Sequence, residues 1–386
     1  MTGDRASRSG HPAVEADPRS TSPVPAGSDQ PSAEEPTSGT DLITLKRVLI
    51  VAAILAVAIA AFYFLAPNLA GLEETWNRIR QGSPAWLALA FAFEVMSFGG
   101  YILLFRAVFG EGHPISWRAS CEIAMGGVVA TRVLAAGGAG GIAFIAWAVT
   151  RLGLAAREVA WRLTAFLICQ YAVFMFTVII GGVGLRIGLL PGPAPFSLTI
   201  VPALLATGVV AVCLGFTLAP ADLPDRLESL ARRRPRLARV ARWLATVPAT
   251  LGSGVRGAIH LVRHGGWRIP AGAVGWWAFD IATLWACFHA FGGSPEIPVV
   301  VLGYFVGQLG NLIPLPGGIG GVEGATIGAL IGFGVSGGLA LVAVLAYRGF
   351  AFWLPMLPGA LAYFTLRRTV REESLSSEPQ PEPVAP

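Results

Sequence analysis

The stretch GQLGNLIPLPGGIGGVE, residues 307–323, decides the fold, because it places two prolines and six glycines inside an apolar region. The flanking residues, from 298 to 334, are otherwise apolar enough to enter a membrane. Proline removes a backbone hydrogen-bond donor and glycine weakens a helix interior, so this region cannot form one continuous helix. We expect two half-helices joined by a turn at Pro316 to Gly321.

A second apolar region, residues 117–150, is interrupted in the same way by the sequence GGAGG at Gly137 to Gly141. A shift of 180 residues places four glycines of the first turn on four of the second: Gly137, Gly138, Gly140 and Gly141 on Gly317, Gly318, Gly320 and Gly321. The half-helix after the second turn would rise roughly 18 Å, a little more than half of a hydrocarbon core about 30 Å thick. Both regions are therefore predicted to be re-entrant helical hairpins. The alternative makes 117–136 a full span and leaves 142–150 as a short remainder.

The composition indicates an integral membrane protein. Of 386 residues, 54% are hydrophobic and only 13% are charged, and the mean hydropathy is +0.63. A large water-soluble catalytic domain is excluded by these values. Six further apolar runs are long enough to cross a bilayer: about 48–66, 86–108, 163–186, 197–219, 270–291 and 338–366. The predicted fold is an all-α polytopic membrane protein with six full spans plus two re-entrant hairpins.

Charge divides the chain into a basic membrane domain and two acidic tails. Residues 1–41 and 372–386 have no apolar run and are predicted to be disordered. The transmembrane domain, 42–371, holds 25 Lys and Arg against 12 Asp and Glu, or +13, and includes a basic loop at 220–269. Within that loop, the arginines from Arg232 to Arg242 are interleaved with apolar residues. This pattern favours a helix on an anionic inner leaflet, and we expect no nucleic acid partner.

The positions of lysine and arginine orient the spans in the cytoplasmic membrane. With both termini in the cytoplasm, 20 Lys and Arg fall in the inner loops and 3 in the outer loops. This count requires each hairpin to enter and leave on one side, the first from the cytoplasm and the second from outside. The two halves then have opposite orientations, which is an inverted repeat with a binding site expected near the midplane.

Six charged side chains fall within apolar segments, where an unpaired charge is costly. They are Glu94, Glu122, Arg132, Asp280, Glu323 and Arg348. Helix rise places Glu323 and Arg348 about 15 Å deep, so they can meet as a pair, and Asp280 reaches the same level. The first two glutamates are expected nearer the interfaces. We predict a charge network of Asp280, Glu323 and Arg348, with a static ion pair between the last two as the alternative.

The glycine turns are suited to binding an anion such as a phosphate. Successive N–H groups can converge there, and a half-helix that begins after the turn adds the positive end of its dipole. Arg132 precedes the first turn and can bind phosphate in bidentate fashion. Gln308 and Asn311 precede the second turn and could line a cavity or cap backbone groups. In the alternative reading, the glycines only permit bending and close packing.

The pattern predicts neither a metal nor a cofactor. His260 and His264 have a spacing that metal sites use, but no third ligand is evident. The glycine turns follow no strand and lack the acidic residue of a dinucleotide site.

The run from Gly307 to Glu323, followed by Tyr347-Arg348 and Leu354-Pro355, resembles the signature of the lysylphosphatidylglycerol synthase transmembrane, or flippase-like, family. The resemblance covers most of residues 45–367. It implies movement of aminoacylated phosphatidylglycerol between leaflets by the membrane domain, whereas a separate cytosolic domain makes the lipid. Since only about 20 residues follow the last predicted span, we expect no synthase activity here.

These observations predict translocation of a phospholipid or a lipid-linked phosphate headgroup through a polar midplane cavity. One alternative is an integral-membrane transferase that acts on a lipid phosphate, with Glu323 or Asp280 as general base. Another is an accessory subunit of an envelope-synthesis complex. Membrane lipids are the expected partners, and a second copy of the chain or envelope-synthesis enzymes are the protein partners that this setting allows.

Overall fold

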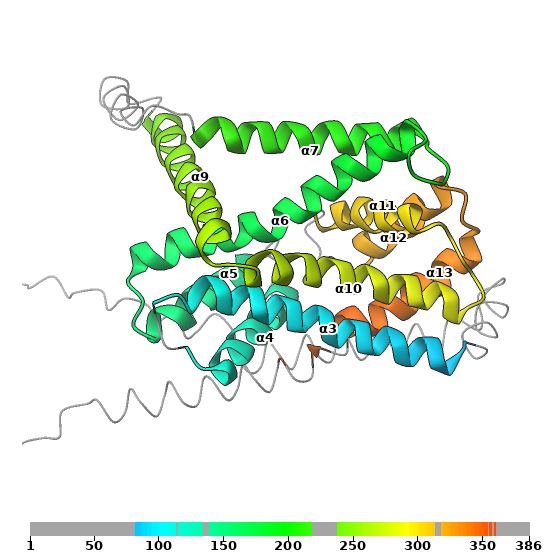
Figure 1. Ribbon diagram of the computed structural model, residues 1–386, viewed down its shortest axis with the longest axis horizontal. Coiled ribbons are helices and arrows are strands. Elements are labelled where there is room, and N and C mark those ends of the chain that lie inside the picture. Colours follow the sequence, from blue (N-terminus) through cyan, green and yellow to red (C-terminus); the bar gives the residue numbers. More distant parts are fainter. Residues whose placement is uncertain are drawn as a thin grey trace, which may run out of the picture. The chain divides into compact units, whose positions relative to one another are not determined.

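The computed structural model describes residues 82–112, 115–133, 139–217, 238–312, 318–353, 355, 356 and 359, which all belong to one compact unit, Leu45–Pro386. Every regular element in these ranges is helical (Figure 1). The predicted span 48–66 and the predicted tails 1–41 and 372–386 lie outside the described residues.

Four long apolar helices have the length and composition to cross a membrane, as a multi-pass membrane protein requires. They are α3 (Pro84–Phe109), α6 (Ala156–Arg186), α7 (Phe196–Thr217) and α10 (Arg268–Ala290). Three of them begin and end within two residues of the predicted spans. α6 begins seven residues before its predicted span because its first turns are polar and extend the helix beyond the apolar run.

Helices α3 and α10 cross in antiparallel contact. The Ser83 N–H donates to the Ala290 carbonyl at 2.8 Å, and the Ser97 hydroxyl donates to the Trp276 carbonyl at 2.8 Å. Glycine allows the backbones to touch from the second of these points onward. A Cβ added at Gly100 would lie 2.6 Å from the Trp276 nitrogen, and a Cβ at Gly272 would lie 2.6 Å from the Leu104 nitrogen. Larger residues at either position would force the two helices apart.

Shorter helices occupy both glycine-interrupted regions. The first holds α4 (Trp117–Val133) and α5 (Ala139–Arg151). The second holds α11 (Ile297–Gln308), a 3₁₀ turn η4 (Leu309–Leu312) and α12 (Gly321–Gly332). Each apolar region thus holds two separate helices, and Ala139 to Gly141 of the first predicted turn already belong to α5.

Each of these helix pairs packs antiparallel through glycines. In α4 and α5, Gly127 faces Ile145 and Gly141 faces Thr131. In α11 and α12, Gly303 faces Leu330 and Gly307 faces Thr326. The two pairs therefore share one mode of contact.

The last predicted span, 338–366, does not begin as one continuous α-helix. Helix α13 (Gly337–Arg348) changes into a π-helical turn, η6 (Gly349–Trp353). A π-turn holds an extra residue and frees a carbonyl from the α-helical pattern. Most residues beyond this turn lie outside the described ranges.

The basic loop contains a long helix, α9 (Ala238–His264). Its second half packs on α6, where Gly254 lies against Thr164 and Gly257 against Trp161. The side chains from Arg232 to Arg242 lie outside the described residues.

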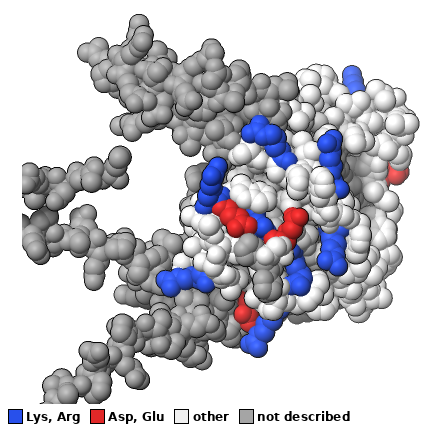
Figure 2. Space-filling view, turned by 60° about the vertical axis from the view of Figure 1, so that its left-hand side comes forward, with Lys and Arg blue, Asp and Glu red and all other residues white. Residues whose placement is uncertain are grey.

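Charged residues gather at one end of the helix assembly, where α3 and α9 end and α6 begins. Figure 2 shows arginines around a small acidic group on this face. Two i,i+4 ion pairs lie at the starts of α4 and α6, Arg118 with Glu122 at 2.9 Å and Arg162 with Glu158 at 2.8 Å. Arg162 also donates to the Glu111 carbonyl at 2.7 Å, so it ties the start of α6 to the loop after α3.

Candidate functional site

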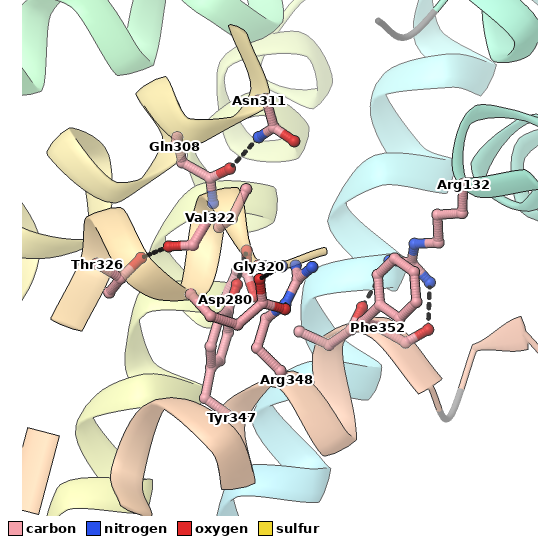
Figure 3. A network of polar contacts seen from close by, with 12 residues as sticks. Arg132, Asp280, Gln308, Asn311, Gly320, Val322, Thr326, Tyr347, Arg348 and Phe352 are labelled. Carbon is pink, nitrogen blue, oxygen red and sulfur yellow. Dashed lines mark hydrogen bonds and ion pairs between the residues drawn. The ribbon is translucent and has the colours of Figure 1, made fainter. Parts of the chain in front are cut away.

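A cavity of about 460 Å³ lies among the membrane helices. Its wall is built by α3, α4, α6, α10, α11, η4, α13 and η6. Aromatic side chains form much of it, and the charged or amide-bearing side chains that line it are Glu94, Arg132, Gln170, Asp280, Gln308, Asn311 and Arg348. Figure 3 shows several of them from close by. A cavity with polar lining is the setting in which broken helices are tolerated within a membrane.

Asp280 is held in the wall by two tyrosines. It projects from α10, is 6% exposed, and accepts hydrogen bonds through Oδ2 from the hydroxyl groups of Tyr304 and Tyr347, the second at 3.2 Å. Its other oxygen, Oδ1, has no hydrogen-bond partner among the described residues. The carboxyl group is thus fixed in place with one oxygen still available.

Glu94 lies in the same cavity, buried among helices and not on the solvated surface that a place near the interface would give it. It is 2% exposed, and its Oε2 has no hydrogen-bond partner within the described part of the chain. The antiparallel crossing of α3 and α10 places it beside Asp280 in the cavity wall, where the two carboxyl groups interact electrostatically. Glu122, by contrast, pairs with the exposed Arg118 as an interface residue would.

Glu323 and Arg348 form the predicted ion pair. The Arg348 Nε donates to Glu323 Oε1 at 2.6 Å, and the two side chains are 12% and 17% exposed, respectively. The second carboxylate oxygen accepts the Gly320 N–H at 2.7 Å, which makes Glu323 a capping residue at the start of α12. The expected meeting of these charges is confirmed, and Tyr347 links the neighbouring Asp280 to the same helix as Arg348.

Arg132 reaches from the end of α4 to the π-turn. Its guanidinium group donates to the carbonyl oxygens of Phe352 at 2.9 Å and Ala351 at 2.5 Å (Figure 3). It also lies over the Phe352 ring, 5.1 Å from the ring centroid, and the Arg348 guanidinium lies 4.7 Å from the same centroid. Two cationic groups from opposite halves of the sequence therefore converge on one buried aromatic ring at the cavity wall.

The second glycine turn has the backbone that its sequence predicts. Gly318 and Gly320 have positive φ angles of 67° and 81°, which side chains with a Cβ rarely adopt. Gly321 begins α12. The carboxylate of Glu323 occupies the start of this helix, where the sequence predicts an anion.

The other predicted turn residues divide into described and undescribed ones. Gly140 and Gly141 are buried in the first turn of α5. Gly137, Gly138 and Gly317 lie outside the described residues. Gln308 accepts a hydrogen bond from the Asn311 amide at 2.9 Å, and both line the cavity, so the two amides pair with each other as well as facing it.

Sequence reasoning missed the aromatic part of the wall. Tyr304 and Tyr347 orient Asp280, and Trp276 lines the cavity with its Nε1 buried and without a hydrogen-bond partner in the described ranges. Their spacing along an apolar helix does not differ from that of core residues. His260 and His264 stack on α9 with ring centroids 4.3 Å apart, and the described residues contain no group of three side chains suited to a metal ion.

The chain matches a family model over most of its length and two curated membrane proteins over shorter segments. The family model of the lysylphosphatidylglycerol synthase TM region matches residues 49–359. A UPF0104 membrane protein of Methanothermobacter thermautotrophicus is 34% identical over 91 residues, which are 23% of this chain and 26% of the relative. A second UPF0104 membrane protein of that organism is 34% identical over 86 residues, which are 22% and 26% of the two chains. The matched segments thus span about a quarter of each curated relative. Because the family model covers the described helices and the cavity that they enclose, this chain belongs to the lysylphosphatidylglycerol synthase TM region family.

Proposed function

We propose that this protein moves the phosphate-bearing headgroup of a lipid across the membrane through the cavity. The observation that carries this proposal is the convergence of Arg132 and Arg348 on Phe352 at the cavity wall. Guanidinium groups bind phosphate oxygens in bidentate fashion, and a partly dehydrated site strengthens such contacts. The headgroup would bind between these arginines while the acyl chains stay in lipid.

The size and polarity of the cavity suit such a ligand. Its volume of about 460 Å³ lies within the usual range for small-molecule sites. The described hydrogen bonds of Arg132 go to two backbone carbonyls. A phosphate would offer the guanidinium stronger, charged acceptors than these neutral ones. Binding a lipid headgroup at Arg132 would therefore loosen the link between α4 and the π-turn.

The helix bounds support an arrangement of the chain as two repeats. Adding 180 to the bounds of α3 gives 264–289, against Arg268–Ala290 for α10. The same addition gives 297–313 for α4, against 297–312 for α11 with η4, and 319–331 for α5, against Gly321–Gly332 for α12. Since α3 and α10 are antiparallel, the halves that contain them would have inverted orientations. In such transporters the substrate site lies at the interface of the repeats.

The topology within this proposal has six spans, two re-entrant hairpins and both termini in the cytoplasm. The short α4–α5 and α11–α12 pairs would be the hairpins. The arginine-rich end in Figure 2 would face the cytoplasm, in agreement with the preference of Lys and Arg for that side. The transmembrane domain would extend over 42–371, with its basic loop against the anionic leaflet.

Movement of fluorescent lipids in proteoliposomes tests the function. The full-length chain is reconstituted, and phosphatidylglycerol, aminoacyl-phosphatidylglycerol and a polyprenyl phosphate are compared. We expect protein-dependent movement of at least one of them, and its loss in Arg132→Ala. The matched control is Arg118→Ala, which removes an arginine whose side chain is 84% exposed at the charged end.

The outcomes separate this function from its alternatives. Equal movement in wild type, Arg132→Ala and protein-free vesicles would overturn the proposal. A chemically altered headgroup, detected by mass spectrometry of the recovered lipids, would favour a transferase. Folded protein that moves and alters none of the lipids would favour the role of an accessory subunit.

A further inference from the structure

We infer that Glu94 and Asp280 form a proton-binding site that shares one proton between their two carboxyl groups. This inference rests on the proposed function only in its consequence for the headgroup. The site itself stands on the geometry of α3 and α10. Neither the ion pair of Glu323 with Arg348 nor the glycine turns take part in it.

Each of the two carboxyl groups has one buried oxygen that lacks a hydrogen-bond donor. Glu94 and Asp280 are 98% and 94% buried, given exposures of 2% and 6%, and both line the cavity. Oε2 of the first and Oδ1 of the second lack a partner among the described residues. A buried carboxylate oxygen without a donor is costly, and two adjacent carboxylates in a weakly polar setting repel each other. One proton between them removes the repulsion and supplies the missing donor.

The surroundings assign the proton to Glu94. Asp280 already accepts two hydrogen bonds from Tyr304 and Tyr347, which stabilise its ionised form. Glu94 has Thr283 beside it on α10, but the Thr283 hydroxyl donates to backbone carbonyls at 2.9 and 3.4 Å. Glu94 would therefore carry the proton and donate it toward Asp280 Oδ1.

Other charged and titratable groups face this pair from each neighbouring helix. Arg132 on α4 attracts both carboxyl groups. Cys287 on α10 interacts electrostatically with Glu94, and Tyr347 on α13 does so with both acids. Tyr347 is followed in the sequence by Arg348, which forms an ion pair with Glu323. Within the described residues, the groups around the pair thus supply one cation, Arg132, for two acids.

This balance links the proton to the headgroup. With one proton bound, Asp280 balances Arg132, and Glu323 balances Arg348, so the charged set around the cavity is neutral. Without the proton it carries one negative charge and repels a phosphate. Proton and anionic headgroup would therefore bind together, and by linkage each would strengthen the binding of the other. A proton gradient could then bias the direction of lipid movement.

Infrared difference spectroscopy tests the proton site without any lipid substrate. The purified full-length protein in detergent is stepped through pH, and the C=O stretch of protonated carboxylic acids is followed. We expect a titrating band from a buried acid in the wild type that is absent in Glu94→Gln. In Asp280→Asn the repelling charge is gone, so Glu94 gives up its proton more readily and the band should disappear at lower pH. Glu122→Gln, at the charged end, should leave the band unchanged.

The results distinguish failure of the proton site from failure of the transport function. The proton site is overturned if the wild type has no titrating buried-acid band, or if a folded Glu94→Gln variant keeps the band. If Glu94→Gln does not fold, an unshifted band in Asp280→Asn overturns it. A band that behaves as expected, in a protein that moves no lipid, supports the proton site and rejects the transport function.

A second measurement tests the linkage. Binding of a short-chain phosphatidylglycerol to the wild type should weaken about tenfold as the band titrates, the size of a typical coupling between sites. Glu94→Gln, which resembles the protonated state, should bind with an affinity that does not change over the same pH range. Equal pH dependence in both proteins would overturn the linkage.

Discussion

Glu323 on α12 accepts the Arg348 Nε at 2.6 Å through one oxygen and the Gly320 N–H at 2.7 Å through the other. The same carboxylate thus caps the half-helix after the glycine turn and joins it to α13. Glu323 therefore has two structural roles, as a helix cap and as the partner of Arg348. Its removal should affect folding before it affects any ligand.

A double-mutant cycle measures this pair. Glu323→Gln and Arg348→Met should each lower the midpoint of thermal unfolding in detergent, because each removes one partner of a partly buried ion pair. The double variant should lose less than the sum, with a coupling free energy of about 0.5–3 kcal/mol. Strictly additive losses would mean that the ion pair contributes nothing. Lipid movement that survives in a folded double variant would assign the pair a structural role alone.

Removing either tyrosine hydroxyl from Asp280 should destabilise the protein. Tyr304→Phe and Tyr347→Phe each take away one donor from a buried acceptor, for which a loss of about 1–3 kcal/mol is typical. Thermal unfolding of the purified variants measures it. Tyr171→Phe is the control, since that cavity side chain is 48% exposed. An equal effect in all three variants would argue against a special role of the hydroxyl groups on Asp280.

Gly100→Ala should disrupt the crossing of α3 and α10. The added methyl would lie 2.6 Å from the Trp276 nitrogen, and a backbone atom cannot rotate away as a side chain can. The neighbouring Gly99→Ala is the matched control, because no described atom lies within 4 Å of its added Cβ. In a helix interior, Gly→Ala alone stabilises by roughly 1 kcal/mol. We expect a lower yield of folded protein for the first variant only, measured by size-exclusion chromatography in detergent.

Gly307→Ala should separate α11 from α12. Its Cβ would collide with the side chain and the Cα of Thr326, whereas no described atom lies within 4 Å of a Cβ added at Gly324. The expected result is reduced lipid movement and a lower unfolding midpoint in Gly307→Ala, but not in Gly324→Ala. Unchanged behaviour of both variants would show that this close contact is dispensable.

Much of the fold follows from the sequence because a bilayer sets the length of a helix. The runs 86–108 and 270–291 predict α3 and α10 to within two residues, and the glycines predict that each interrupted apolar region holds two shorter helices. The π-turn after Arg348 was not predicted. Its residues, Gly349 to Trp353, are as apolar as those of a regular span, so nothing in their composition predicts a π-turn. The turn makes tertiary contacts that the sequence does not reveal, such as the hydrogen bond from Arg132 to the Phe352 carbonyl.

The candidate site was predictable for its charges and not for their partners. Depth along each helix predicted that Glu323 would meet Arg348. The position of Glu94 within its own apolar run predicts a place near the interface, because that run alone does not show which helix packs beside it. It lies as many residues from the start of α3 as Asp280 does from the end of α10, and this equality becomes informative only once the two helices are known to be antiparallel. The sequence gives the positions of the two acids along their helices, but it does not show that these helices pack against each other.

The glycine crossing of α3 and α10 has a mechanical consequence. Two helices in backbone contact should behave as one rigid unit. This helix pair carries both carboxyl groups of the cavity, Glu94 and Asp280. The guanidinium groups project from other elements, Arg132 from α4 and Arg348 from α13. The two acidic side chains of the cavity are therefore carried by one helix pair, and the two guanidinium groups by neighbouring helices. Moving α4 or α13 relative to this pair would change the distance between opposite charges. A proton bound at Glu94 and Asp280 would therefore change the energy that such a movement requires.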